Sequence, residues 1–268
     1  RFRNVTGVQT CALPISLVCT ALWWRGRVPF PFLGSDLANI SSYAAALLHP
    51  ERFVGDIAIG DPKSFRFYFA AHVPLLMVLG PWVGDFGSAA LLLLPIVLLI
   101  QTLGFYVLGR LLFGHRFYAT LLALMSLGKV DLTIDYIGSF HDVEPRFLFQ
   151  AFLPWLLASV IRLGDRPSLW PMIMAGAGLL IYVHPVSAPS VAFATWLGLW
   201  AYRVETIPVA FLRLIVAGVV FLLVSAPFLW VYLKSREYGA SDDAGALLEA
   251  QRQLIGAEFF DFRGYIRE

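Results

Sequence analysis

Residues 86–109 read FGSAALLLLPIVLLIQTLGFYVLG, and these 24 residues contain no charged side chain. A helix needs roughly 20 apolar residues to cross a bilayer, so this run predicts a membrane-spanning helix that Pro95 only kinks. The rest of the chain is similar, with 59% of its 268 residues hydrophobic and 14% charged. Soluble domains carry about 25% charged residues, so we predict an all-α, polytopic transmembrane helical bundle.

Six spans are expected in this bundle, at about 86–109, 117–138, 147–162, 168–184, 187–202 and 209–233. Two of them come from residues 167–202, which contain no Asp, Glu, Lys or Arg. These 36 residues are too many for one helix, so we place a break at His184-Pro185. The charged and polar residues 234–268 are expected to be extracytoplasmic.

The first sixteen residues are expected to be foreign to the protein. Residues 5–15, VTGVQTCALPI, resemble a translated short-read sequencing adapter codon for codon, which indicates an assembly artefact over 1–16. Cys19 is then the only native cysteine, which excludes an internal disulfide. Residues 17–24 are expected to be the tail of a truncated first span. The C-terminus is also expected to be cut, so the sequence would be a fragment.

Charges in the short turns predict the orientation. One side of the predicted spans receives Arg110, Arg116, Arg162, Arg166 and Arg203. Cytoplasmic loops carry an excess of Lys and Arg, so the loop 25–85 and the connections 139–146 and 184–187 are expected on the extracytoplasmic face of the inner membrane. The net charge of +2 and the lack of a dense basic run argue against a nucleic-acid partner.

The loop 25–85 is expected to carry two interfacial helices. Ser35 can cap the first one, His49-Pro50 ends it, and its apolar face contains Leu37, Ile40, Ala44, Leu47 and Leu48. Asp36 lies in the first turn, where the helix dipole favours a carboxylate, and a simple helix-start role competes with a functional one. The second, 65–79, is interrupted by Arg66, His72 and Pro74 and is expected to be interfacial or half-buried.

Several side chains are candidates for chemistry. The sequence His141-Asp142-Val143-Glu144-Pro145-Arg146 places two acids and a base between two spans, although a solvated turn explains the same pattern. His184 is first interpreted as a satisfied histidine at a helix break, and Tyr43 as a packing residue. Lys129, Asp131 and Asp135 fall within the 117–138 span, where a charge costs about 2.5–3.5 kcal/mol. They are expected to form an ion pair or to face a substrate path.

The order of these parts resembles the GT-C superfamily of membrane glycosyltransferases, which includes protein O-mannosyltransferases and lipid A aminoarabinose transferases. The similarity lies in Asp36 followed by Tyr43-Ala44-Ala45-Ala46, in Pro50-Glu51-Arg52-Phe53 and Asp56, and in YVLGRLLFG at 106–114. Glu144-Pro145-Arg146 and His184-Pro185 are similar to motifs of bacterial members.

This resemblance implies sugar transfer from a polyprenyl-phosphate donor to an acceptor at the outer face of the lipid bilayer. Asp36 would be the general base that activates the acceptor hydroxyl. Asp142 or Glu144 matches a second acidic position, near which relatives hold a divalent cation or the donor phosphate. Arg146, His141 and His184 would bind the lipid phosphate. Leu37 follows Asp36 where the mannosyltransferases have a second acid, a departure that bears on metal use and acceptor type.

The alternative hypothesis is a transporter or flippase-like protein, in which Lys129, Asp131 and Asp135 would line the substrate or proton path. A membrane scaffold without catalysis is a third interpretation. The long loop 25–85 favours the enzyme, because transporters generally keep such loops short. The enzyme hypothesis requires the carboxylates of Asp36 and of Asp142 or Glu144 to face one cavity.

Overall fold

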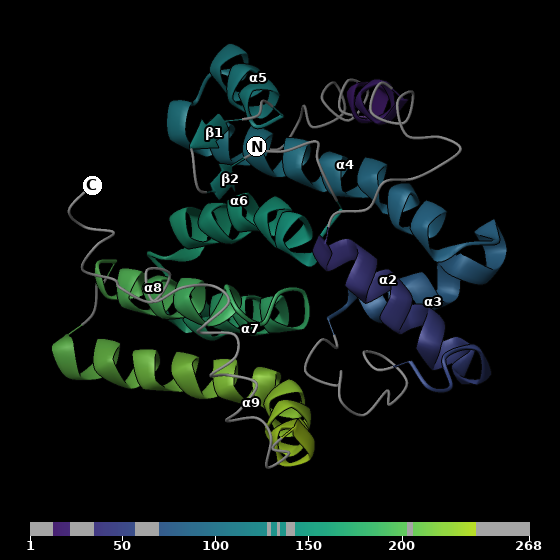
Figure 1. The fold of residues 1–268 in the computed structure, drawn as a ribbon. Coiled ribbons are helices and arrows are strands. Elements are labelled where there is room, and N and C mark those ends of the chain that lie inside the picture. Colours follow the sequence, from purple (N-terminus) through teal and green to yellow (C-terminus); the bar gives the residue numbers. More distant parts are fainter. Residues whose placement is uncertain are drawn as a thin grey trace, which may run out of the picture.

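The computed structural model describes residues 13–21, 35–56, 70–127, 130–132, 135–137, 143–202 and 206–239 (Figure 1). Within these residues the helices are α2 (Ser35–Leu48), α3 (His72–Val83), α4 (Phe86–Phe113), α5 (Arg116–Met125), α6 (Pro145–Leu163), α7 (Trp170–Leu179), α8 (Ala188–Trp200) and α9 (Ile207–Gly239). Short 3-10 turns are η1 (Pro50–Arg52), η3 (Pro167–Leu169) and η4 (Leu180–Tyr182). Residues 13–21 are also helical. The strands β1 (Val130–Leu132) and β2 (Asp135–Ile137) form an antiparallel pair.

Three helices in the described residues are long and apolar enough to cross a membrane: Phe86–Phe113, Pro145–Leu163 and Ile207–Lys234. At 1.5 Å per residue, the 28 residues of α4 extend about 42 Å and the 19 of α6 about 28 Å, and a hydrocarbon core is about 30 Å thick. These helices coincide with the spans predicted at 86–109, 147–162 and 209–233. The chain is therefore a predominantly helical protein with three candidate membrane spans.

The other three predicted spans contain shorter helices. The expected continuous helix over 117–138 is wrong, because α5 ends at Met125 and the β1–β2 pair follows. Asp131 and Asp135 therefore lie in the strands β1 and β2 rather than on a spanning helix, and Lys129 lies outside the described residues. Farther along, helical structure stops at Tyr182 and α8 has only 13 residues, which extend about 20 Å.

Two helix boundaries also differ from expectation. Helix α3 begins at His72 rather than at residue 65. Pro74 suits the first turn of this helix, because an N–H at that position would have no helical partner. Gly84, with a φ of +94°, ends the helix in the left-handed conformation. At the other end of the chain, α9 continues past residue 233 to Gly239.

Small residues let the helices approach closely. A Cβ on Gly104 of α4 would lie 2.6 Å from the Nε1 atom of Trp155 in α6, so only glycine fits there. The indole N–H of Trp155 donates to the carbonyl of Ile100 at 2.9 Å. Gly109 allows the same closeness to Ala119 of α5. Helix α4 therefore packs directly against both α5 and α6.

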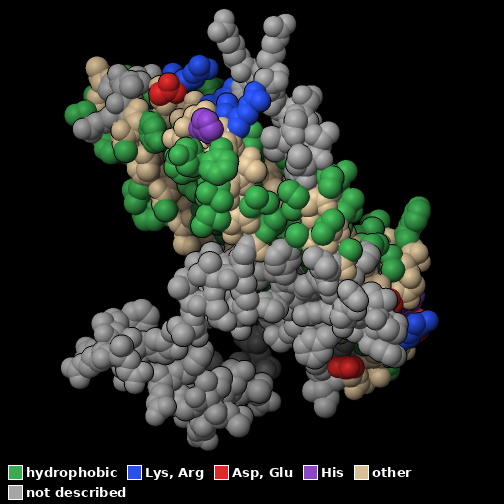
Figure 2. Space-filling model, turned by 90° about the horizontal axis from the view of Figure 1, so that it is seen from above, with side chains coloured by type: hydrophobic (Ala, Val, Ile, Leu, Met, Phe, Trp, Pro, Cys, Tyr) green, Lys and Arg blue, Asp and Glu red, His purple; other side chains and the backbone are tan. Residues whose placement is uncertain are grey.

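Many apolar side chains remain exposed on the outer faces of the helices, where lipid would cover them. In α9, only 17% of the most hydropathic window is buried inside the protein. Its exposed side chains include Phe211, Leu212, Ile215, Val219, Leu222 and Leu223. Figure 2 shows apolar side chains over much of the visible face. Burying such a face in lipid rather than in protein accounts for the high hydrophobic content of the chain.

The turns of the bundle collect at its ends. In Figure 1 the end of α4, the end of α6 and the start of α9 lie towards one edge of the molecule. The starts of α2, α3 and α6 lie near the centre, next to the end of α7. This second group of termini positions the candidate site.

Candidate functional site

Three connections from distant parts of the sequence meet beside the start of α3. The backbone N–H of Ala71 donates to the carbonyl of Tyr182 at 2.6 Å, which ties the start of α3 to the end of η4. His72 lies close to the backbone of Val143, just before α6, and to the imidazole of His184. The segments that precede α3, α6 and α8 therefore share one location, which we call the His72 junction.

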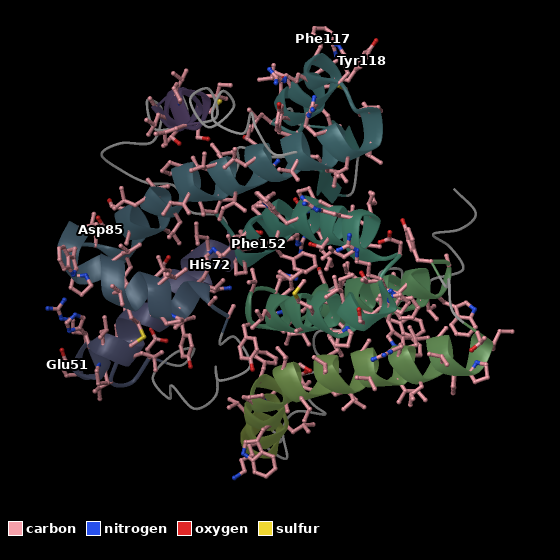
Figure 3. All side chains as sticks on the ribbon, turned by 180° about the vertical axis from the view of Figure 1, so that it is seen from behind. Glu51, His72, Asp85, Phe117, Tyr118 and Phe152 are labelled. Atoms are coloured by element: carbon pink, nitrogen blue, oxygen red, sulfur yellow. The ribbon has the colours of Figure 1, made fainter. Side chains whose placement is uncertain are left out.

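His72 is the most unusual side chain of this junction (Figure 3). It is fully buried, and neither Nδ1 nor Nε2 makes a hydrogen bond of normal geometry within the described residues. Burial lowers the pKa of His72 from 6.5 to about 4; the nearby Val143 backbone opposes this shift and His184 adds to it. Since α3 is not one of the candidate spans, His72 is a neutral imidazole in the body of the protein at neutral pH.

His184 occupies the turn between η4 and α8. Its Nδ1 atom accepts a hydrogen bond from the backbone N–H of Ser187 at 3.2 Å, and its ring lies 5.9 Å from the ring of Phe149. An accepting Nδ1 places the proton of the neutral ring on Nε2. His184 therefore fulfils the structural role expected at a helix break and also contributes its imidazole to the His72 junction.

Glu144, Pro145 and Arg146 form the start of α6. Pro145 is the first helical residue, Glu144 precedes it in extended conformation, and the Glu144 side chain does not cap the helix. Glu144 is half-buried and Arg146 is exposed. A guanidinium beside a helix N-terminus, where backbone N–H groups point outward, is suited to hold a phosphate.

Helix α2 brings the first-loop acid towards the same region. The predicted helix that ends before His49-Pro50 is confirmed, with Leu37, Ile40 and Ala44 buried; Ser35, expected as its cap, is its first residue. Leu37 is buried in the main apolar cluster of the protein, and Figure 1 shows the start of α2 near the start of α6. Asp36 lies in that turn, although its side chain lies outside the described residues.

Two other predicted residues lie elsewhere on this helix and beyond it. Tyr43 is 2% exposed and packs in the core, as expected. Asp56 is exposed and follows η1, beyond the end of α2. Because α2 is about 20 Å long, the structure does not bring Asp56 to the His72 junction.

The remaining predicted site residues fall outside the described part of the chain. They are His141, Asp142 and Lys129, together with the side chains of Asp131 and Asp135. In the described residues no three His, Cys, Asp or Glu side chains form a group that could hold a metal ion. A divalent cation at the expected position would have Glu144 as its described ligand and Asp142 as the other.

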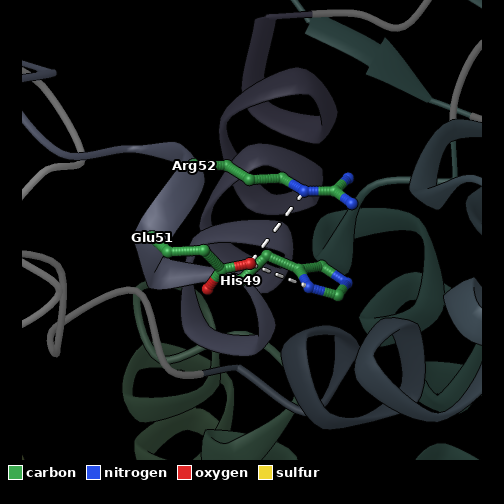
Figure 4. Close-up of polar contacts among 3 residues, drawn as sticks. All are labelled: His49, Glu51 and Arg52. Carbon is green, nitrogen blue, oxygen red and sulfur yellow. Dashed lines mark ion pairs between the residues drawn. The ribbon is translucent and has the colours of Figure 1, made fainter.

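A second concave site lies at the far end of α2 and α3. A groove of about 440 Å³ lies between His49 and Arg52 on one side and Gly84 and Asp85 on the other. Glu51 Oε1 lies 3.6 Å from Nδ1 of His49 and 4.0 Å from Nε of Arg52, and these are the two ion pairs drawn in Figure 4. The sequence predicted no site there.

Sequence reasoning also missed His72, which it treated as an interruption of an apolar segment. The signal in the sequence was the position of His72 between Ala70-Ala71 and Val73. When such an apolar segment at the start of a helix packs into the core, its histidine is buried with it. Comparisons add no relative, since no family model, curated protein or solved structure matches the chain.

Proposed function

We propose that this chain is a GT-C-type membrane glycosyltransferase, which transfers a sugar from a polyprenyl phosphate to an acceptor at the extracytoplasmic face. The observation that carries the proposal is the His72 junction, where the Glu144-Pro145-Arg146 segment and the His184 turn meet the start of α3. These two motifs are the ones through which the sequence resembles bacterial members of that superfamily. The first turn of α2, which contains Asp36, packs into the same core.

The proposed reaction divides the work among these residues. The acceptor oxygen attacks the anomeric carbon, its proton passes to the carboxylate of Asp36, and the bond between the anomeric carbon and the phosphate oxygen breaks. The polyprenyl phosphate leaves as an anion. Arg146 and the N-terminus of α6 hold this anion before and after transfer. A divalent cation, if Glu144 and Asp142 bind one, would neutralise part of the phosphate charge.

His72 and His184 act as neutral groups in this scheme. A buried neutral imidazole does not repel the guanidinium of Arg146, as a second cation would. The buried His72 ring also excludes water from the connection before α6. We therefore assign His72 a positioning role beneath the Glu144-Pro145-Arg146 segment.

The test is sugar transfer by the purified protein in proteoliposomes, with polyprenyl-phosphate-linked radiolabelled hexoses and pentoses as donors. Asp36→Asn should lower kcat by about 10²–10⁴-fold, because it removes the general base. Arg146→Gln should instead raise KM for the donor. Asp165→Asn, an exposed acid in the turn after α6, is the matched control and should transfer normally.

Two results would contradict this proposal. One is unchanged transfer by Asp36→Asn with normal expression. The other is accumulation of intact labelled donor inside the vesicles without any glycosylated product, which would favour the transporter hypothesis.

A further inference from the structure

The groove between the end of α2 and the α3–α4 turn has walls of opposite charge. His49 and Arg52 line one side, and Asp85 lines the other. We call this the α2–α4 groove. It lies at the end of α2 and α3 away from His72, as the positions of Glu51, Asp85 and His72 in Figure 3 show. It is therefore separate from the proposed catalytic site.

Two glycines keep this groove open. A Cβ on Gly80 would lie 2.8 Å from the ring of Phe86, so the ring packs directly on backbone there. Gly84 has a φ of +94°, which residues with a side chain rarely adopt. The space beside Asp85 is consequently bounded by backbone and an aromatic ring rather than filled by a side chain.

The charged groups of the groove retain capacity for a ligand. Glu51 Oε1 lies at the long distances of 3.6 Å from His49 and 4.0 Å from Arg52; the Glu51 and Arg52 side chains are largely exposed and that of His49 is half-buried. Such pairs are weak in water. Asp85 Oδ1 accepts a hydrogen bond from the backbone N–H of Ser88 at 2.7 Å, which caps α4. A cap occupies one carboxylate oxygen, so Oδ2 can accept from a ligand.

The surroundings match the boundary between water and lipid. Asp85 immediately precedes α4, the clearest candidate span, so the groove lies where that helix would enter the hydrocarbon. Trp82, beside it, is 87% exposed. Exposed tryptophans at the end of a spanning helix are typical of the headgroup region.

We propose that the α2–α4 groove binds the headgroup of a zwitterionic phospholipid with a primary amine. The phosphate takes the place of the weakly held Glu51 carboxylate beside Arg52 and His49, and the ammonium group donates to Asp85 Oδ2. A headgroup with only negative charge would meet repulsion from Asp85. A choline headgroup has no N–H to donate, so phosphatidylethanolamine fits both walls better than phosphatidylglycerol or phosphatidylcholine. This inference does not rest on the proposed sugar transfer.

The experiment is native mass spectrometry of the protein released from vesicles that contain equal amounts of these three phospholipids. The wild-type protein should retain phosphatidylethanolamine preferentially. Arg52→Gln should weaken retention of all three lipids on the order of tenfold, because it removes a charge-assisted hydrogen bond. Asp85→Asn keeps a capping oxygen for Ser88 and should reduce phosphatidylethanolamine only to the level of phosphatidylcholine.

Arg166→Gln and Asp165→Asn are matched controls, because both residues are exposed in the turn after α6. They should retain lipid as the wild-type protein does. Equal retention of the three lipids by the wild-type protein would overturn the proposal. So would preferential retention of phosphatidylglycerol, or equal losses in the groove and control variants.

Discussion

His72 is fully buried at the start of α3, where no described side chain or backbone group makes a good hydrogen bond with its ring. A buried polar group without a partner costs about 1–3 kcal/mol. The fold nevertheless places this group where three connections meet. We interpret that cost as the consequence of a role at the site, since an apolar side chain would fill the same space more favourably.

Replacing the His72 imidazole should raise the stability of the protein and lower its activity. His72→Leu should raise the melting temperature of the detergent-solubilised protein at pH 7, because it removes a buried polar group that makes no good hydrogen bond in the described part of the chain and keeps most of the buried volume. The same variant should lower sugar transfer by changing the connection before α6. A lower melting temperature would contradict this account and would indicate a hydrogen-bond partner for His72.

The pH dependence of stability gives a second measurement on the same variant. Above pH 6.5 His72 is neutral in both folded and unfolded chains, so it contributes no pH dependence. Between pH 6.5 and its folded pKa of about 4, only the unfolded chain takes up the proton. The free energy of unfolding should therefore fall as the pH is lowered through this range, by up to about 3 kcal/mol. His72→Leu should flatten that part of the stability profile.

The burial of individual side chains was predictable where the residue spacing within one helix determines it. The spacing of Leu37, Ile40 and Ala44 predicted a buried face of α2, and all three are buried. The location of His72 beside Val143 and His184 was not predictable, because it depends on how three helices pack together. Roles for Asp36 and Asp142 remain predictions from the resemblance.

The elements differ in how clearly the sequence specifies them. Long apolar runs predicted α4, α6 and α9, because a helix satisfies its backbone groups internally in lipid. The error at 117–138 came from extending the apolar helical segment that begins at residue 117 into residues 130–137, whose hydrophobic pattern is that of a strand. Val130, Leu132 and Tyr136 alternate with Asp131 and Asp135, which is the two-residue period of a strand. In the structure Leu132 pairs with Asp135 across the two strands.

The contact between α4 and α6 can be tested with two glycines in different settings. A Cβ on Gly104 would lie 2.6–2.8 Å from Trp155 and Pro154, so Gly104→Ala should force the helices apart and cost about 1–3 kcal/mol. Gly176 in α7 has open space around its Cβ position. Gly176→Ala should therefore stabilise the protein by up to about 1 kcal/mol, from helix propensity alone.

Equilibrium unfolding in mixed micelles measures both changes in the free energy of unfolding. The expected result is opposite signs for the two alanine variants. Equal changes in the free energy of unfolding for Gly104→Ala and Gly176→Ala would mean that Gly104 does not pack against α6.

Across the whole molecule, the topology follows from the order and length of the helices. Helix α4 runs from Phe86 to Phe113 and α6 from Pro145 to Leu163, and Figure 1 shows both ending towards the same edge. Arg116 begins α5 just after α4, Arg162 lies in the last turn of α6, and Arg166 lies in the turn that follows. Positive charge in short turns favours the cytoplasmic side, so the α2–α4 groove and the His72 junction are expected to face the opposite side.

Cysteine labelling tests this orientation. In a background with Cys11→Ser and Cys19→Ser, Val54→Cys places a thiol in the exposed segment after η1 and Asp165→Cys places one in the turn after α6. A membrane-impermeant maleimide added to intact cells should label Val54→Cys, because that segment precedes the candidate span α4 and is expected on the extracytoplasmic side. Asp165→Cys should react only after the membrane is permeabilised. Labelling of both thiols in intact cells would show that α4 and α6 do not cross the membrane in the same direction. The reverse pattern would place the His72 junction in the cytoplasm, where a lipid-linked sugar presented at the outer face could not reach it.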